Sequence, residues 1–261
     1  MDYKTIILEK DGYIATLTLN RPDDLNALSP QVYDELYDVC DNVTNDGQTR
    51  VLVIKGNGKA FCAGADLKEV HKILGDVPGM RRFVELCHRT YDAIEALPIP
   101  TVASVHGMVL AGGIELAEVC DIIISAESCR IGDQHAGYGL IAGGGGTQRL
   151  IRQMHYRKAR ELLITGDWLT AKEAQMYGFV SQVVPDDQLE EATAKMARKL
   201  AERSPMASKC VKMLVNRGIQ VDLPNALQLE KAAVQQHYLS EDFKEGVTAF
   251  IEKRKPNFPG R

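Results

Sequence analysis

The sequence predicts an α/β core followed by a helical C-terminal region, and three observations lead to this prediction. Up to about residue 130, short apolar runs alternate with helical patterns, which is typical of parallel strands joined by right-handed helical crossovers. Residues 51–54 are wholly apolar, as in a strand covered on both faces of its sheet. After Gly146 the pattern becomes almost entirely helical.

The N-terminal elements follow from turn and cap signals. Residues 5–8 and 14–19 are short apolar or β-branched runs separated by Asp11-Gly12, which predicts a β-hairpin. Ser29 is a favourable N-cap before Pro30, and apolar residues then recur at helical spacing. Further strands are predicted at 51–54, 101–105 and 122–125, with helices at 67–74, 80–97 and 112–119.

The C-terminal part contains one predicted strand, at residues 179–183. The predicted helices are at 159–163, 171–177, 189–202, 206–215, 227–238 and 241–253. We therefore divide the chain into a core, residues 1–195, and a helical region, residues 196–261.

Composition and charge exclude several classes of protein. The 261 residues are 45% hydrophobic and 25% charged, so the chain can form a core without disulfides or metals. It has 31 Lys and Arg against 35 Asp and Glu, and this net charge of −4 argues against a nucleic-acid partner. The six cysteines form no CxxC pair, which favours a reducing compartment. No signal peptide and no membrane-length apolar run is evident, so we expect a cytoplasmic protein with no membrane partner.

Two glycine-bearing turns each follow a predicted strand and precede a helix. They are residues 61–66 and residues 107–115. Backbone N–H groups at such a turn are unsatisfied, so they can bind an anion or a developing oxyanion. Neither turn matches a nucleotide-binding fingerprint, and a turn of this kind taken alone is more often just a tight connection.

Two titratable residues lie in this glycine-rich context. Glu115 falls in the first turn of an apolar helix, where a carboxylate either has a functional partner or stabilises the helix dipole. His135 titrates near neutral pH and precedes a run of four glycines, 143–146. Such a run lets the backbone approach a ligand closely or adopt positive φ, and both interpretations stay open here.

Taken together, these segments resemble the crotonase family, also called the enoyl-CoA hydratase/isomerase superfamily. The resemblance covers almost the whole chain, in motifs at 19–22, 25–28, 61–68, 111–117, 120–121, 143–150, 165–166 and 252–258. It implies a core of repeated ββα units arranged in a spiral and a C-terminal helical trimerisation region. It also implies a homotrimer, or a homohexamer built as a dimer of trimers.

The resemblance further implies that the substrate is an acyl-CoA thioester. Coenzyme A is then part of the substrate, and no metal or other cofactor is expected. The backbone N–H groups of Ala63 and Gly112 match the two donors of the family's oxyanion hole, which stabilises an enolate. The residues expected to bind substrate are Ala65, Asp66, Leu67 and Lys68 in the coenzyme A groove, Asn26, Ala27 and Leu28 near the adenine, and Gly113 and Tyr138. The basic tail at 253–258 is expected to reach the coenzyme A phosphate of a neighbouring subunit.

The resemblance has one departure, at the second catalytic position. Family hydratases use two glutamates; Glu115 matches the first, and His135 stands in place of the second. We expect Glu115 to orient and deprotonate water, and His135 to pass a proton to or from Cα. The predicted reaction is hydration or double-bond isomerisation next to the thioester. The alternatives are hydrolysis of a thioester or C–C bond, or decarboxylation, in a β-keto or cyclic acyl-CoA with His135 as the base, and a non-catalytic acyl-CoA-binding protein.

Overall fold

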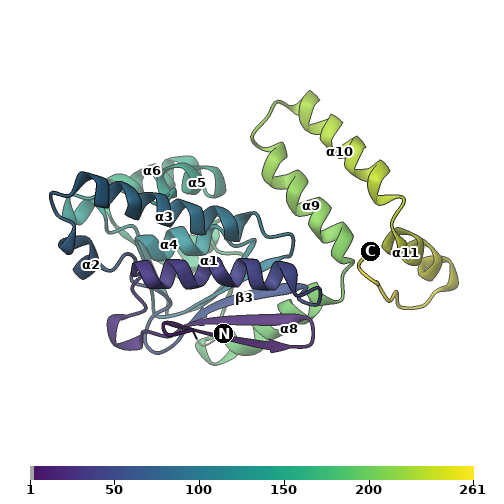
Figure 1. Ribbon diagram of the computed structural model, residues 1–261, viewed down its shortest axis with the longest axis horizontal. Coiled ribbons are helices and arrows are strands. Elements are labelled where there is room, and N and C mark those ends of the chain that lie inside the picture. Colours follow the sequence, from purple (N-terminus) through teal and green to yellow (C-terminus); the bar gives the residue numbers. More distant parts are fainter. Residues whose placement is uncertain (1–2) are drawn as a thin grey trace.

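The computed structural model describes residues 3–261 and contains a six-stranded sheet at the centre of the core (Figure 1). The strands lie in the order β1-β2-β3-β4-β6-β9, and all neighbours are parallel except the antiparallel pair β1 and β2. The hairpin predicted at Asp11-Gly12 is confirmed, because Asp11 pairs with Ile14. The strand bounds are Ile6–Asp11 (β1), Ile14–Leu19 (β2), Val51–Gly56 (β3), Thr101–Val105 (β4), Ile122–Ala126 (β6) and Gln182–Val184 (β9).

The parallel register brings the two glycine-bearing turns together. β3 and β4 run side by side, with Leu52 opposite Thr101, and every residue of β4 is buried. The carboxyl ends of neighbouring parallel strands lie at one edge of the sheet. The turns that follow β3 and β4 therefore start at the same edge, and Cys62 of the first turn bridges to Val109 after the second strand.

A second, three-stranded sheet was not predicted. It consists of β5 (Met108–Leu110), β7 (Arg130–Gly132) and β8 (Trp168–Thr170), in the order β5-β7-β8. The expectation of only one strand after Gly146 was therefore wrong, because β8 also lies there. The expected strand at 179–183 begins later, at Gln182, since the amides of Phe179 and Val180 donate to the Ala174 carbonyl instead of to a neighbouring strand.

Helices cover both faces of the large sheet, with α1 and α3 on one side and α8 on the other (Figure 1). The predicted N-cap is confirmed, since the Ser29 hydroxyl accepts from the Val32 amide at 3.4 Å. The bounds of the core helices are Pro30–Asn45 (α1), Leu67–Lys72 (α2), Val77–Glu95 (α3), Gly112–Glu118 (α4), Gly146–Gln153 (α5), Tyr156–Thr165 (α6), Ala171–Met176 (α7) and Leu189–Ala201 (α8).

The C-terminal region forms an arm that projects from the core (Figure 1). It consists of α9 (Pro205–Gly218), α10 (Leu223–His237) and α11 (Glu241–Glu252), with α9 packed against α10. The predicted boundary at 195/196 falls inside α8. Because α8 packs on β3, β4 and β6, the chain leaves the core only after Ala201. Large apolar side chains remain exposed on the arm, including Phe250 at 85%.

Within residues 3–261, no helix combines the length and the apolar character needed to cross a membrane.

Candidate active site

The two glycine-bearing turns meet at the start of α4. Ala111, the N-cap of α4, has φ +48 and ψ −115, a conformation that strains a residue with a Cβ and aims the next amide outward. Gly112 is the first residue of the helix, so its N–H has no intrahelical acceptor. A Cβ on Gly112 would lie 3.2 Å from the amide nitrogen of Ala65 in the other turn. The backbones at Ala65 and Gly112 are therefore in close contact.

The hydrogen bonds of the first turn correct one expected donor. The Ala63 amide donates to the Leu25 carbonyl at 3.0 Å, so it is already used within the protein. By contrast, the amides of Ala65 and Gly112 donate to no acceptor among residues 3–261. The sequence identified the turn but not the direction in which each amide points. The donor pair that the geometry offers is Ala65 and Gly112, not Ala63 and Gly112.

Glu115 follows Gly112 by three residues, on the same face of α4. Its side chain lies in the interior, with the residue only 5% exposed. One oxygen, Oε1, accepts from the amide of Gly144 at 2.7 Å and from that of Gly146 at 3.0 Å. The other oxygen, Oε2, has no hydrogen bond within the described residues. The glycine run therefore orients the carboxylate and leaves Oε2 available for chemistry.

Tyr91 on α3 supports both parts of this arrangement. Its hydroxyl donates to the Gly112 carbonyl at 2.9 Å and lies 3.2 Å from the Tyr33 hydroxyl. Its ring is so close to Gly144 that a Cβ there would lie 2.3 Å from Tyr91 Cε2. Burial raises the pKa of Tyr91 well above its usual value, so the hydroxyl remains a donor.

Arg149 on α5 holds the glycine run against α3. Its Nη1 donates to the Gly144 carbonyl at 3.0 Å, while its Nε and Nη2 bind Glu95 Oε2 at 3.1 and 3.0 Å. Nη2 also binds Asp92 Oδ1 at 2.6 Å. A guanidinium can make all these bonds at once because its donors are fixed in one plane. Neither Tyr91 nor Arg149 was identified from the sequence, although Arg149 lies in the 143–150 motif.

His135 lies in the loop that follows β7, and its partner is Asp133. The His135 Nδ1 hydrogen-bonds with the Asp133 Oδ1, and the two side chains are 13% and 5% exposed. Burial lowers the pKa of His135, but the Asp133 hydrogen bond and charge, together with the charge of Glu115, raise it above its usual value on balance. The structure thus brings His135 within electrostatic reach of Glu115, and no hydrogen bond joins the two in the described part of the chain.

The residues expected near the adenine have internal partners. Asn26 is 1% exposed; its Nδ2 donates to the carbonyls of Asn57 and Ala60, and its Oδ1 accepts from the Arg21 amide. Leu28 is fully buried, and the Ala27 carbonyl accepts from the Arg21 guanidinium. The side chains of Asn26 and Leu28 therefore shape the turn from inside and are not free to contact a ligand.

The expected coenzyme A groove is partly exposed. Asp66 is 5% exposed, caps α2 through the Lys68 amide and pairs with Arg21 at 2.9 Å. Leu67 is 54% exposed, and the Lys68 ammonium, on a largely exposed side chain, pairs with Asp24 at 2.9 Å. Leu67 and Lys68 thus present the accessible surface here, while Asp66 holds the loop.

Two further expected contacts fall at opposite extremes of burial. Gly113 is buried so tightly that a Cβ would lie 2.4 Å from the Cys62 carbonyl oxygen, so it serves close packing of the two turns. Tyr138 is 75% exposed on the short 3-10 turn Ala136–Tyr138. Burial raises the pKa of Cys62 to about 12, which agrees with a packing role for this thiol.

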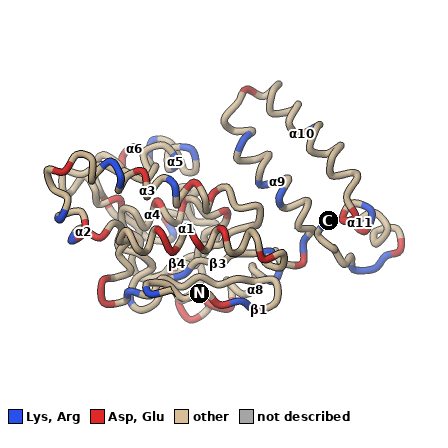
Figure 2. The backbone as a smooth tube through the Cα atoms, viewed as in Figure 1, with Lys and Arg blue, Asp and Glu red and all other residues tan. Residues whose placement is uncertain are grey.

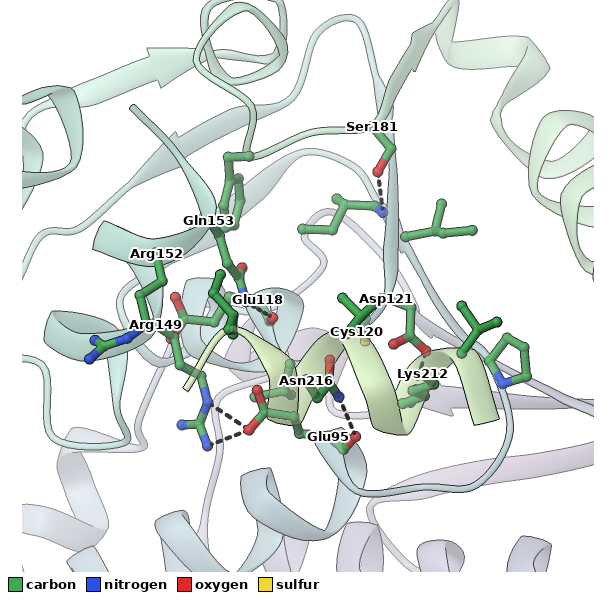
Figure 3. A pocket seen from close by; sticks show the side chains of 18 of the residues that line it. Glu95, Glu118, Cys120, Asp121, Arg149, Arg152, Gln153, Ser181, Lys212 and Asn216 are labelled. Carbon is green, nitrogen blue, oxygen red and sulfur yellow. Dashed lines mark hydrogen bonds and ion pairs between the residues drawn. The ribbon is translucent and has the colours of Figure 1, made fainter. Parts of the chain in front are cut away.

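A cavity of about 720 Å³ lies next to the C-terminal end of α4 and is lined by residues of α4, α5 and α9, among others (Figure 3). Its lining includes Glu118, Arg149 and Lys212 but none of the predicted catalytic residues. Glu118 is 1% exposed, and neither carboxylate oxygen has a hydrogen-bond partner among residues 3–261. Burial and then the charge of Glu115 raise the pKa of Glu118 well above its usual value, against the opposing charge of Arg149.

Along the backbone, Lys and Arg are interspersed with Asp and Glu (Figure 2). In the basic tail, Arg254 pairs with Glu245 at 2.6 Å and Lys255 with Glu202 at 2.9 Å. These two side chains therefore have ion-pair partners in their own chain, and a contact with the phosphate of a neighbouring subunit stays a prediction. No group of three or more His, Cys, Asp or Glu residues suited to a metal ion occurs within 3–261.

Comparison with known proteins identifies the family. A family model described as enoyl-CoA hydratase/isomerase matches residues 9–261. A short-chain-enoyl-CoA hydratase from Clostridium acetobutylicum is 38% identical, covering 98% of this chain and 97% of its own. A crotonyl-CoA hydratase from Syntrophomonas wolfei is 38% identical over 99% of both chains. The crystal structure of an enoyl-CoA hydratase from Bacillus anthracis superimposes with a TM-score of 0.95 at 37% identity, covering 99% of this chain and 100% of that one. The chain therefore belongs to the enoyl-CoA hydratase/isomerase family, as the resemblance to crotonases predicted, and is an enzyme of the hydratase/isomerase type.

Proposed function

We propose that this enzyme adds water across the conjugated double bond of a short enoyl-CoA thioester. One observation carries the proposal. Among residues 3–261, the amides of Ala65 and Gly112 have no acceptor, and Gly112 lies one turn of α4 from Glu115, whose Oε2 accepts no hydrogen bond. Such a site can stabilise an enolate and activate water beside it. The relatives named as short-chain-enoyl-CoA and crotonyl-CoA hydratases support this choice of substrate.

In this mechanism the thioester oxygen accepts hydrogen bonds from the amides of Ala65 and Gly112. Negative charge develops on that oxygen as the double-bond electrons move toward the carbonyl. One well-placed donor of this kind is typically worth about 3–4 kcal/mol of barrier. The strained Ala111 and the Tyr91 hydrogen bond to the Gly112 carbonyl keep the second amide in place before substrate arrives.

The protons move between water, Glu115, Cα and His135. Glu115 Oε2 takes a proton from water as the water oxygen bonds to Cβ. The resulting enolate takes a proton at Cα from Nε2 of the protonated His135 ring, the form that the charges of Asp133 and Glu115 favour. The proton on Glu115 then returns to His135, directly or through solvent, and both groups regain their starting state. The sum is one water molecule added across one double bond.

A second candidate is hydrolysis of a thioester or C–C bond in a β-keto or cyclic acyl-CoA. The Asp133–His135 pair favours it, because a histidine held by a carboxylate also serves as a base toward water. In that reaction His135 would have to be neutral before it takes a proton. Because Asp133 and Glu115 raise the pKa of His135 and so favour its protonated form, this environment supports hydration over hydrolysis.

The remaining assignments belong to the same proposal. We place the coenzyme A moiety over the exposed side of the Leu67 and Lys68 segment, and we expect no metal or other cofactor. We further propose a homotrimer or homohexamer assembled through the C-terminal arm, whose exposed apolar side chains include Val215 at 64% and Phe250 at 85%. A cytoplasmic location remains part of the proposal.

The test is to incubate the purified protein with crotonyl-CoA and to identify the product by mass spectrometry. Hydration predicts an intact thioester that is heavier by one water molecule. Free coenzyme A or CO₂ from β-keto or cyclic acyl-CoA substrates, with crotonyl-CoA unchanged, would support the hydrolase or decarboxylase alternative. No turnover of any of these compounds would refute the proposal.

A further inference from the structure

We infer that Asp133 is a positioning residue for the reaction: it holds the His135 ring through Nδ1 so that Nε2 acts as the proton donor at Cα. This inference rests on the proposed function. Asp133 is not among the motif residues that carry the family resemblance, and it is not part of the proposed oxyanion hole of Ala65 and Gly112.

The backbone around Asp133 is fixed on both sides. Asp133 directly follows Gly132, the last residue of β7, and the Gly132 carbonyl accepts from the Ala111 amide at 3.1 Å. A Cβ on Gly132 would lie 3.0 Å from the Trp168 ring, so this strand end is closely packed. On the other side, the Gln134 side chain donates to the Gly166 carbonyl. The loop is therefore tied directly to the turn that presents the Gly112 amide.

The hydrogen bonds of the pair suggest catalysis more than simple packing. Asp133 is 3% exposed, and its carboxylate has no side-chain or backbone hydrogen bond in residues 3–261 except the one to His135. A purely structural buried aspartate would be expected to bind backbone amides, as Asp66 does at the start of α2. The His135 Nε2, in turn, has no partner among these residues. The ring is thus anchored at one nitrogen and free at the other.

The charges around the ring favour its protonated form. Asp133 on the same loop and Glu115 on α4 both raise the pKa of His135, and burial opposes them. Helix α6 packs against the 3-10 turn that follows His135. Its charged side chains do not shift the pKa of the ring; they are Arg157, Lys158, Arg160 and Glu161. Asp133 is therefore the principal group that favours the protonated form of the ring, in which Nε2 carries a proton.

The variant Asp133→Asn tests this role because it preserves shape and removes the charge. We expect kcat for crotonyl-CoA at about pH 8 to fall roughly 10²-fold, the lower end of a general-acid contribution, with KM little changed. We also expect the alkaline limb of the kcat profile to move to lower pH, since the ring loses its proton sooner. The matched control is Asp167→Asn, which removes the same charge from an exposed residue of a neighbouring loop.

Nuclear magnetic resonance of ¹⁵N-labelled histidine reads the ring directly, without any turnover. The His135 signal, assigned by its loss in His135→Gln, should titrate above the ordinary histidine range in the wild type and lower in Asp133→Asn. Equal midpoints, or equal kcat profiles for Asp133→Asn and Asp167→Asn, would overturn the inference. A wild-type enzyme that fails to hydrate crotonyl-CoA but shows the shifted midpoint would refute the proposed function and leave the Asp133–His135 pairing established.

Discussion

Gly144→Ala is the substitution whose consequence follows most directly from the geometry. A Cβ at this position would lie 2.3 Å from Tyr91 Cε2 and 2.9 Å from Glu115 Oε2. Carbon atoms in contact are normally about 3.5–4.0 Å apart, so loop and ring must separate by roughly 1 Å or more. The Gly144 amide now donates to Glu115 Oε1 at 2.7 Å. A displacement of that size would take it beyond the usual hydrogen-bond distance of about 3.2 Å.

We expect Gly144→Ala to lower kcat for crotonyl-CoA roughly 10²-fold, which is the typical cost of misplacing a catalytic group by about 1 Å. Overpacking should also lower the free energy of unfolding by about 1–3 kcal/mol. Steady-state kinetics and denaturant unfolding at fixed protein concentration measure the two effects.

The matched control for this substitution is Gly143→Ala. Gly143 is the preceding residue, and its added Cβ would have nothing closer than the Ile141 carbonyl oxygen at 4.0 Å. Both variants change the flexibility of the unfolded chain equally, so their difference isolates the close contact. If Gly144→Ala folds and its kcat stays within about threefold of that of Gly143→Ala, the assigned positioning of Glu115 is refuted.

Three further predictions concern groups around the site. Arg149→Lys should reduce kcat about 10-fold with little change in KM, because an ammonium cannot bind Gly144, Glu95 and Asp92 at once; unchanged kcat would contradict this. Glu118→Met should raise the free energy of unfolding by about 1–3 kcal/mol, since the buried carboxyl has no hydrogen bond to any residue of 3–261. The pKa of the Glu118 carboxyl is higher in the folded state than in the unfolded state. Above the unfolded-state pKa, the unfolded chain therefore loses a proton that the folded protein retains. The gain measured by denaturant unfolding should therefore be larger at about pH 8 than at about pH 5, and a pH-independent gain would refute the assignment. The Cys62 thiol should react with iodoacetamide only after unfolding, as followed by peptide mass spectrometry, because burial raises its pKa to about 12; rapid labelling of the folded enzyme would show otherwise.

The elements that the sequence predicted well are those with strong local signals. Asp11-Gly12 marks a hairpin and Ser29-Pro30 marks a helix start, and both depend only on neighbouring residues. β5, β7 and β8 have three residues each, and they exist only because they pair with one another. Such short strands carry too little periodicity to be recognised before the fold is known.

In the candidate site, too, the features with local signals were predicted and those that depend on the folded chain were not. The motifs located Glu115, His135 and the two turns, because these residues stand at fixed spacings within them. Which amide of the 61–66 turn is free depends on peptide orientation, which residue types do not encode. The motif therefore points to Ala63, whereas Ala65 has the N–H without an acceptor among residues 3–261. Asp133 lies two residues before His135, but their pairing needs the loop to fold back after β7. Tyr91 reaches the site from α3, which is distant in the chain.

The central claim is that Glu115 and His135 together add water to an enoyl-CoA. The most direct measurement compares hydration of crotonyl-CoA by the wild type, Glu115→Gln and His135→Gln at saturating substrate, with bound crotonyl-CoA measured by calorimetry. We expect hydration by the wild type, a loss of about 10²–10⁴-fold in each variant, and nearly unchanged binding. Hydration by His135→Gln at the wild-type rate, or a wild type that binds crotonyl-CoA but never hydrates it, would show that the two residues do not act together in this reaction.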